Sequence, residues 1–542
     1  MKNILAKTGQ PNNVLNHILD QPELPAIIQS LDTGVLTRLI RHIGLESSAE
    51  IISLTTIEQL KCIFDEDLWN SDAPGQDEVF DADRFGLWLD MLLETGASFA
   101  ARKVMELDED LMTLGLCRLI LVVNLDALAF LLSNRHRSIR DDLLDKVLES
   151  TLNAEFDAYL VIAKSDIHWD AIQALFSELN ELDHTMLNRL LERCYQISWE
   201  YIEDNGGLFD VLSSEEMLES DLAADREARR EVEGFVLPSN ARYFLNSARM
   251  TGLREIVDGK TPDPVTRGYF DSMNGKADVF FQPIEKSEQD GETAPNIVGF
   301  LQTLQSQEVL QSPYQKRLGC LEESRDHSFP LVKALRNLDT TGPSIYCKRR
   351  MELAYLSNIL ISGCEFKRRR FRPVEAFEAA LSLCSLGSEY LLDGRPGKGS
   401  NQSADNISAL LVNYDLVKLF RVGWKILNKR VVFHTARALL KACDHHADRL
   451  QSQGPAHEMG KMVDMLRTCI LSGKPWMFLD QIDQLHSFLD GDIIDGLGAL
   501  LQEYPTMPAA VCNQGLHRLP HFISSRAHIQ SIQQYLERAL EI

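Results

Sequence analysis

The sequence predicts an all-α protein built from stacked helical hairpins, on two observations. Apolar residues recur at steps of three and four, and short polar turns interrupt the pattern. One unit recurs between Ala26 and Leu121: an apolar pair, a leucine, a polar turn and a leucine-led amphipathic stretch. Its copies begin at Ile27-Ile28, Ile51-Ile52 and Val104-Met105. Because each helix of a packed pair buries one stripe, we expect a repeat or solenoid-like array.

An N-terminal helical-repeat region is expected over residues 1–198. Asp81-Ala-Asp83 suits a helix start, because carboxylates stabilise the positive end of a helix. The following residues Phe85, Trp88, Leu89 and Leu92 then share one face. A further hairpin is expected around the turn at Asp183-His184.

The most apolar stretch, Leu111 to Leu132, is long enough to span a bilayer. It contains Arg118, Asn124 and Asp126, and a charge near the bilayer centre costs roughly 2.5–3.5 kcal/mol. The stretch therefore predicts a buried helix, and we expect no membrane insertion.

The middle region, residues 199–330, is acidic and less regular. From Trp199 to Glu233 acidic residues outnumber three arginines. A solvated helical face is the favoured interpretation, and an acidic docking surface for a basic partner is the alternative. Residues 280–296 lack periodicity and predict a mobile loop.

A C-terminal helical region follows over residues 331–542. We expect one helix to end at Gly363 in a left-handed conformation, and the next to begin at Pro373. Leu391 to Asn406 predicts an exposed loop. The glycines within it do not have the spacing of a phosphate-binding loop, and we expect no cofactor.

Basic residues gather in two sets on either side of the helix that ends at Gly363. At about 1.5 Å per residue, the sets lie roughly 20 Å apart. They are the candidate anion- or partner-binding residues, although pairing with the acidic middle region of the same chain is the favoured interpretation. The seven residues are Lys348, Arg349, Arg350, Arg368, Arg369, Arg370 and Arg372.

Cys443, His445 and His446 form the closest approach to a metal cluster. The apolar stripe of their helix includes Cys443, whereas His445 lies with Lys441 and Arg449 on the polar face. Zinc needs four ligands, and the sequence nominates no others. A structural cysteine is favoured and no metal site is expected.

Composition narrows the class of protein. The chain has 542 residues, of which 44% are hydrophobic, as in ordinary globular proteins. A net charge of −24 repels phosphate backbones, so nucleic acid is not an expected partner. The ten cysteines include no Cys-x-x-Cys pair, and Met1 to Val14 lacks the apolar core of a secretory signal. These features predict a cytoplasmic protein.

Local catalytic signatures are missing from the sequence. It contains no Gly-x-Ser-x-Gly, Ser-x-x-Lys or His-Glu-x-x-His pattern. Acid–base pairs assembled from distant segments leave no such trace, so enzymatic activity stays open but is less favoured than a binding role.

Several short motifs resemble an uncharacterised bacterial family known only as a domain of unknown function. Such a resemblance implies no activity, cofactor or catalytic residue. More weakly, Ala26 to Phe64 is similar to helical repeats of the magnesium transporter E cytoplasmic domain and the flagellar motor-switch protein, which implies architecture rather than role. The motifs of the uncharacterised family are Asp67-Leu-Trp69, Arg84-Phe-Gly-Leu-Trp88, Asp108-Glu-Asp-Leu111, Glu352-Leu-Ala-Tyr-Leu356, Gly363-Cys364 and Phe371-Arg-Pro-Val-Glu375-Ala.

Two functional hypotheses follow. The first is a helical-repeat protein that acts through protein–protein contacts, as a scaffold or regulator. The second is an enzyme or binder of a small anionic ligand, with a pocket between helical regions and the ligand held by Arg368 to Arg372.

Overall fold

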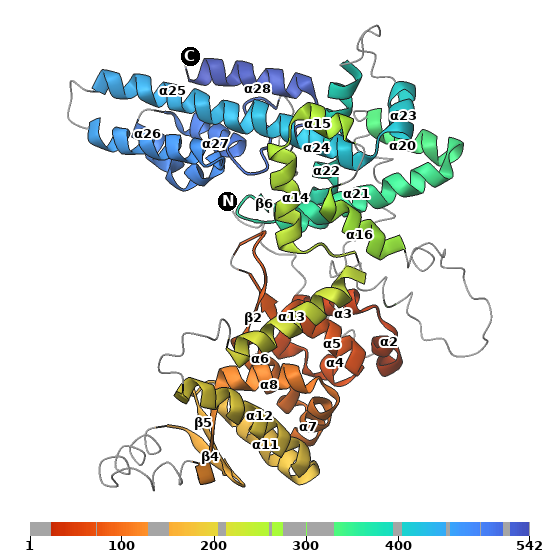
Figure 1. Ribbon diagram of the computed structural model, residues 1–542, viewed down its shortest axis with the longest axis vertical. Helices are drawn as coiled ribbons and strands as arrows, with labels where there is room; N and C mark the ends of the chain where they lie inside the picture. Colours follow the sequence, from red (N-terminus) through yellow and green to blue (C-terminus); the bar gives the residue numbers. More distant parts are fainter. Residues whose placement is uncertain are drawn as a thin grey trace, which may run out of the picture. The chain divides into compact units, whose positions relative to one another are not determined.

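A computed structural model describes most of the chain. The described residues are 23–71, 73–127, 151–203, 213–232, 234–259, 263–274, 300, 330–393, 404–450, 456–487, 489–512 and 521–540. Helices dominate them, which confirms the all-α prediction, and the strands are few and short (Figure 1). The predicted loop at 280–296 and the segment Met1 to Val14 lie outside this part of the chain.

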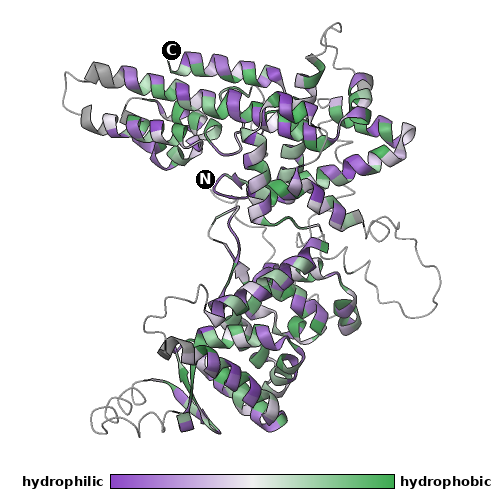
Figure 2. Cartoon of the chain, in the orientation of Figure 1, coloured by the Kyte–Doolittle hydropathy of each residue, from purple (hydrophilic) through white to green (hydrophobic). Residues whose placement is uncertain are grey.

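The chain forms two compact units, each with its own hydrophobic core. Unit 1 comprises residues 1–70, 78–229 and 284–320, and unit 2 comprises residues 71–77, 230–283 and 321–542. Figure 2 shows hydrophobic and hydrophilic residues sharing most helices, the pattern expected of helices that bury one face.

Unit 1 contains helices α2 to α13 and two small antiparallel sheets. In one sheet β1 pairs with β2, and in the other the strand order is β3-β5-β4. The elements are α2 (Leu24–Ser30), α3 (Thr33–Ile43), η1 (Leu45–Ser47), α4 (Ala49–Ser53), α5 (Ile57–Asp67), β1 (Trp69–Asn70), β2 (Val79–Phe80), α6 (Ala82–Glu94), α7 (Ala97–Glu106), α8 (Glu109–Leu119), β3 (Ile120–Asn124), β4 (Asn153–Phe156), β5 (Tyr159–Ala163), α11 (Trp169–Leu182), α12 (His184–Glu203) and α13 (Ser214–Val232), whose last residues belong to unit 2.

The described part of unit 2 contains helices, one short hairpin in which β6 pairs with β7, and an isolated β-bridge between Thr506 and Phe522. Its elements are α14 (Pro238–Met250), α15 (Leu253–Asp258), α16 (Pro264–Asn274), α20 (Pro330–Thr341), α21 (Pro343–Gly363), β6 (Glu365–Phe366), β7 (Arg369–Arg370), α22 (Pro373–Asp393), α23 (Ala404–Asn413), α24 (Leu416–Leu427), the π-helix η2 (Asn428–Val432), α25 (Phe433–Leu450), α26 (Ala456–Leu471), the 3-10 segment η3 (Pro475–Ser487), α27 (Gly491–Leu500) and α28 (Arg526–Ala539).

The prediction for the most apolar stretch of the sequence needs correction. The helix expected over Leu111 to Leu132 ends at Leu119, and Ile120–Asn124 form β3, which pairs with β5. A short apolar run of β-branched residues suits a buried strand as well as a helix. Among the described helices none is long and apolar enough to cross a membrane.

The helix boundaries around Gly363 and Pro373 follow the prediction, but the reason for the glycine differs. Gly363 is the last residue of α21 and does not adopt a left-handed conformation. A Cβ atom there would lie 2.7 Å from the Cβ of Ala241 on α14, so glycine permits close helix packing. The predicted loop from Leu391 to Asn406 is also shorter, because α22 continues to Asp393 and α23 begins at Ala404.

The closest helix pair of unit 2 is α22 and α24. A Cβ at Gly387 would lie 2.0 Å from the carbonyl oxygen of Leu419, and one at Gly423 would lie 2.1 Å from that of Leu383. The two glycines therefore let the two backbones meet. The indole of Trp424 on α24 donates a 3.0 Å hydrogen bond to the carbonyl of Leu245 on α14, so α24 is held between α14 and α22.

Candidate functional site

Unit 2 contains a cavity of about 530 Å³, within the range typical of small-molecule sites. It lies at the amino-terminal half of α24 and is walled by α14, α15, α16 and α21. Charged groups of both signs line it, together with hydroxyl groups and a few apolar side chains. The lining residues are Ser247, Thr251, Glu255, Ile256, Gly259, Asp263, Pro264, Thr266, Arg267, Phe270, Glu352, Asp415, Val417, Lys418 and Arg421. We call this cavity the α24 pocket.

Glu352 is the one carboxyl side chain of α21, and it lines the pocket. Its side chain is 12% exposed, and its two oxygens accept from the Arg349 guanidinium at 2.5 Å and from the backbone N–H of Leu416 at 2.7 Å. Burial raises the pKa of Glu352 to about 7, although Arg349 and the Leu416 N–H favour the charged form. The nearby Asp415 raises it further. A carboxyl group that titrates near neutral pH therefore faces the pocket.

Three charged residues of α24 face the pocket at intervals of three residues. Asp415 is the N-cap, and its side chain accepts from the backbone N–H of Lys418 at 2.7 Å. The Lys418 ammonium donates to the carbonyl of Gly259 at 2.7 Å. Residues at i and i+3 lie on the same side of a helix, so Arg421 follows them along this face.

A buried polar chain joins α16 to α21 beside the pocket. The Thr266 hydroxyl donates to the Asp263 carboxylate at 2.7 Å and lies 3.1 Å from the Tyr355 hydroxyl. Asp263 also caps α16 by accepting from the backbone N–H of Thr266 at 3.0 Å. Burial raises the pKa of Tyr355, so its phenol stays protonated. These contacts fix the position of Asp263 opposite α24.

Arg421 has an unsatisfied donor. One terminal nitrogen lies 3.9 Å from the Asp263 carboxylate, a long ion pair, and the side chain is 13% exposed. Its Nε atom is buried and has no hydrogen-bond partner in the part of the chain that the structure describes. A buried donor without a partner costs roughly 1–3 kcal/mol, and an anionic group in the pocket would remove that cost.

None of the seven basic residues predicted as a binding site lines the α24 pocket. Three of them have acidic partners within unit 2, and the partners are Glu352, Glu375 and Asp480 rather than residues of the acidic stretch 199–233. The pairs are Arg349 with Glu352 at 2.5 Å, Arg369 with Glu375 at 2.7 Å and Arg368 with Asp480 at 3.0 Å.

The other four basic residues differ in their surroundings. Arg370 donates to the Ser71 hydroxyl at 2.6 Å. The guanidinium of Arg350 lies 5.6 Å from the ring centre of Tyr346, within cation–π range. Lys348, Arg350 and Arg372 are exposed. The basic residues that line the α24 pocket, which are Arg267, Lys418 and Arg421, are not among these seven.

The acidic stretch from Trp199 to Glu233 also behaves differently from the favoured interpretation. Part of α13 is buried: Glu215 is 2% exposed and Arg226 3% exposed. Glu215 and Glu219 both pair with Arg118 of α8, at 2.5 and 2.6 Å. The solvated-face prediction holds for Glu216, Asp221 and Asp225, which are exposed, and it is wrong for Glu215 and Arg226, which are buried and pair with residues elsewhere in unit 1.

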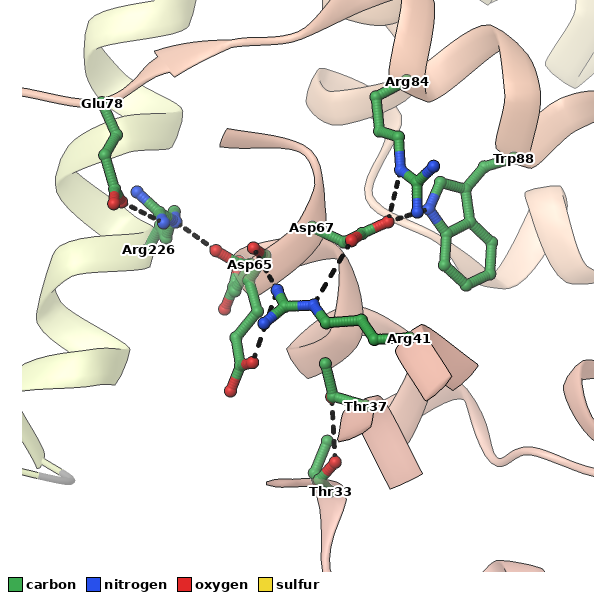
Figure 3. A network of polar contacts seen from close by, with 10 residues as sticks. Thr33, Thr37, Arg41, Asp65, Asp67, Glu78, Arg84, Trp88 and Arg226 are labelled. Atoms are coloured by element: carbon green, nitrogen blue, oxygen red, sulfur yellow. Dashed lines mark hydrogen bonds and ion pairs between the residues drawn. The ribbon is translucent and has the colours of Figure 1, made fainter. Parts of the chain in front are cut away.

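The same side of α13 joins a polar network around the end of α5 (Figure 3). Arg226 pairs with Glu78 at 2.5 Å and donates to the backbone carbonyl of Asp65. Arg229, the next turn along, pairs with the Asp65 carboxylate at 2.7 Å. Charged side chains therefore hold α13 against α5.

Three residues of the family-like motifs, Asp67, Arg84 and Trp88, meet in this network. The Asp67 carboxylate accepts from the Arg84 guanidinium at 2.7 Å and from the Trp88 indole at 2.8 Å. Arg41 lies 3.7 Å from its other oxygen. Asp67 therefore ties α3, α5 and α6 together, which is a structural role.

Cys443 and His445 separate on α25 as predicted. Cys443 is 1% exposed, and His445 is exposed. Burial raises the pKa of the Cys443 thiol to about 12, which fits a packed cysteine. The side chain of His446 lies outside the described residues.

The spacing Asp415-x-x-Lys418-x-x-Arg421 was the sequence signal for the pocket. It places one acidic and two basic residues on one helical face, yet many exposed helices show the same spacing, so it does not by itself indicate a cavity. Glu352 and Tyr355 belong to one of the motifs that carry the family resemblance, but the motif indicates no role.

Comparisons with curated proteins and with solved structures found no match. A comparison with protein families found one, and it confirms the resemblance to an uncharacterised family over the N-terminal part of the chain. The Asp67-Leu-Trp69 and Arg84 to Trp88 motifs fall inside the matched range, and the motifs from Glu352 onward fall outside it. Residues 5–204 match DUF6178, a family of unknown function.

Proposed function

We propose that the protein binds a small molecule in the α24 pocket through an anionic group of that molecule. The supporting observation is the buried Nε of Arg421, which lacks a hydrogen-bond partner among the described residues and borders a cavity of about 530 Å³. Lys418 adds a second cation on the same face of α24. The Asp263, Thr266 and Tyr355 chain holds the opposite wall, so the site is organised before a ligand enters.

The pocket supports this role better than the basic residues first considered. Arg349 and Arg369 already donate to carboxylates within unit 2, and a new anion must compete with them. Among the described residues, Arg421 has the 3.9 Å contact with Asp263, and its Nε has no hydrogen-bond partner. A ligand anion there gains a charge-assisted hydrogen bond, the stronger kind.

The test is a thermal-shift and calorimetric titration of the full chain with phosphate and small mono- and dicarboxylates. A ligand that binds only the folded state raises the melting temperature. Arg421→Gln removes the charge, and we expect it to weaken binding at least tenfold. Arg437→Gln, on an exposed position of α25, is the matched control and should bind like the unaltered protein. No shift with any anion, or equal binding by Arg421→Gln, contradicts the proposal.

A second proposal retains the protein-contact hypothesis. Lys348 and Arg350 on α21, with Arg372 before α22, are exposed and offer cations to an acidic partner. The test is affinity purification of the tagged protein at low and high salt. A stoichiometric partner that is lost from a Lys348→Ala, Arg350→Ala, Arg372→Ala variant supports this role, and purification of the protein alone contradicts it.

A further inference from the structure

The charge of the α24 pocket changes sign along one helix face. Asp415 stands at the amino terminus of α24, and Arg421 follows six residues later. At 1.5 Å per residue, the backbone positions of the two are about 9 Å apart along the helix axis. A ligand that lies along α24 therefore meets carboxylates at one end and a guanidinium at the other.

The acidic end holds more negative charge than its cation balances. Glu352 accepts from the N–H of Leu416, the residue directly after Asp415, so the two carboxyl groups are neighbours. Arg349 pairs with Glu352, whereas Asp415 accepts from the neutral backbone N–H of Lys418. Arg349 offsets the charge of Glu352, so Asp415 supplies the negative charge that favours a cationic group of the ligand.

The basic end has the opposite preference. Lys418 donates to a neutral carbonyl, that of Gly259, rather than to a carboxylate. Arg421 has one distant carboxylate, Asp263, and a buried donor without a partner in the described part of the chain. This end favours an anionic group.

Apolar side chains lie in the same cavity. Ile256, Val417 and Phe270 contribute to its lining, and they suit the methylene groups of a ligand. A ligand with two like charges would be repelled at one end of the pocket, whichever way it entered.

We infer that the α24 pocket binds a zwitterion, a molecule whose ammonium group and carboxylate are separated by a short aliphatic chain, with the ammonium at Asp415 and Glu352 and the carboxylate at Arg421. This inference rests on the proposed function and adds the chemical class of the ligand. It explains why acidic and basic residues share the cavity instead of one sign prevailing.

The first experiment is isothermal titration of the full chain with three probes of equal carbon number: 5-aminovalerate, glutarate and 1,5-diaminopentane. We expect 5-aminovalerate to bind at least tenfold more tightly than either of the others. Glutarate binding as tightly as 5-aminovalerate overturns the inference and leaves the proposed anion site standing. Preference for the diamine, or no binding of 5-aminovalerate, also overturns it, and the anion titrations with Arg421→Gln then decide the proposed function separately.

The second experiment removes the negative charge without removing the helix cap. Asn is as good an N-cap as Asp, so Asp415→Asn keeps the start of α24 and neutralises one carboxylate. We expect this substitution to lower the affinity for 5-aminovalerate at least tenfold and to leave the affinity for glutarate unchanged or higher. Asp490→Asn, at the exposed N-cap of α27, changes the net charge equally outside the pocket and should leave both affinities unchanged. Equal loss in the two variants, or loss of both ligands in Asp415→Asn, contradicts the placement of the ammonium group.

Discussion

The carboxyl group of Glu352 couples the stability of unit 2 to pH. Burial raises its pKa from the ordinary 4.5 to about 7, so between these values the folded protein holds a proton that the unfolded chain has released. Stability falls with rising pH wherever the folded state binds more protons. The contribution of Glu352 is therefore fully present below about pH 4.5 and is lost as the pH rises through about 7.

We accordingly expect Glu352→Gln to remove part of this pH dependence. Chemical unfolding followed between pH 4.5 and 8 should show a free energy that declines less steeply for the variant than for the unaltered protein. Glu537→Gln, on an exposed position of α28, should keep the original profile. A parallel decline in Glu352→Gln would mean that other groups cause it.

Single residues show where sequence reasoning succeeds and where it stops. Cys443 in the core and Asp81 as the N-cap of α6 follow from spacing within one helix. The partners of Arg369 and Arg226 do not, because an ion pair depends on which segments meet. Glu375 is near in sequence to Arg369, but Glu78 is 148 residues from Arg226. The pocket was missed for the same reason, since its walls come from five separate helices.

The contact of α22 with α24 depends on two glycines, and we expect Gly423→Ala to destabilise unit 2. The added Cβ would lie 2.1 Å from the carbonyl oxygen of Leu383, and a backbone atom cannot move aside cheaply. Overpacking of this kind costs typically about 1–3 kcal/mol.

Gly460→Ala is the matched control for that substitution. Gly460 lies within α26, and apart from its chain neighbours and the adjacent backbone of that helix, no atom of the described residues is within 4 Å of its added Cβ. Alanine in a helix is favoured over glycine by roughly 0.5–1 kcal/mol, so this variant should be slightly more stable. Urea unfolding of both variants gives the comparison, and an unchanged or higher midpoint for Gly423→Ala would contradict the close approach.

The buried side of α13 predicts unequal roles for two arginines one turn apart. Arg226 is 3% exposed and pairs with the buried side chain of Glu78, so Arg226→Ala breaks a buried ion pair and should cost about 3–5 kcal/mol. The side chain of Arg229 is 53% exposed, and Arg229→Ala should cost at most about 1 kcal/mol.

Salt provides a second readout for this pair. Exposed ion pairs are screened by salt and buried ones are screened less. Raising the salt concentration should therefore reduce the loss of unfolding free energy that Arg229→Ala causes. It should leave the loss caused by Arg226→Ala nearly unchanged. Equal losses for the two arginines would show that α13 is not held as described.

At the level of elements, local signals predicted helices better than strands. The turn at Asp183-His184 and the helix start at Pro373 were correct because caps and prolines act within a few residues. Strand β3 was missed because its five residues pair with β5, some 40 positions away, and a short apolar run contains no sign of a distant partner. The stacked-repeat arrangement stays a prediction.

Sequence periodicity could not predict how the chain divides into two units, because neither unit is continuous in sequence. Unit 2 includes the short segment 71–77, and unit 1 includes the segment 284–320. Hydrophobic patterns show which face of a helix is buried, but they do not show which core it enters. The two cores contain different residues: Leu60 of α5 belongs to the first and Leu419 of α24 to the second, and both are 0% exposed.

Separate cores predict separable unfolding. A buried carboxylate without a partner costs several kcal/mol, so Leu60→Asp should destabilise unit 1 and Leu419→Asp should destabilise unit 2. Calorimetry of the full chain should resolve two transitions, because chains with several domains depart from two-state unfolding. Each substitution should lower one transition and leave the other near its original temperature. Lys61→Asp, at the exposed neighbour of Leu60, controls for the added charge and should leave both transition temperatures nearly unchanged. A single transition lowered equally by both substitutions would mean that the two cores unfold as one cooperative body.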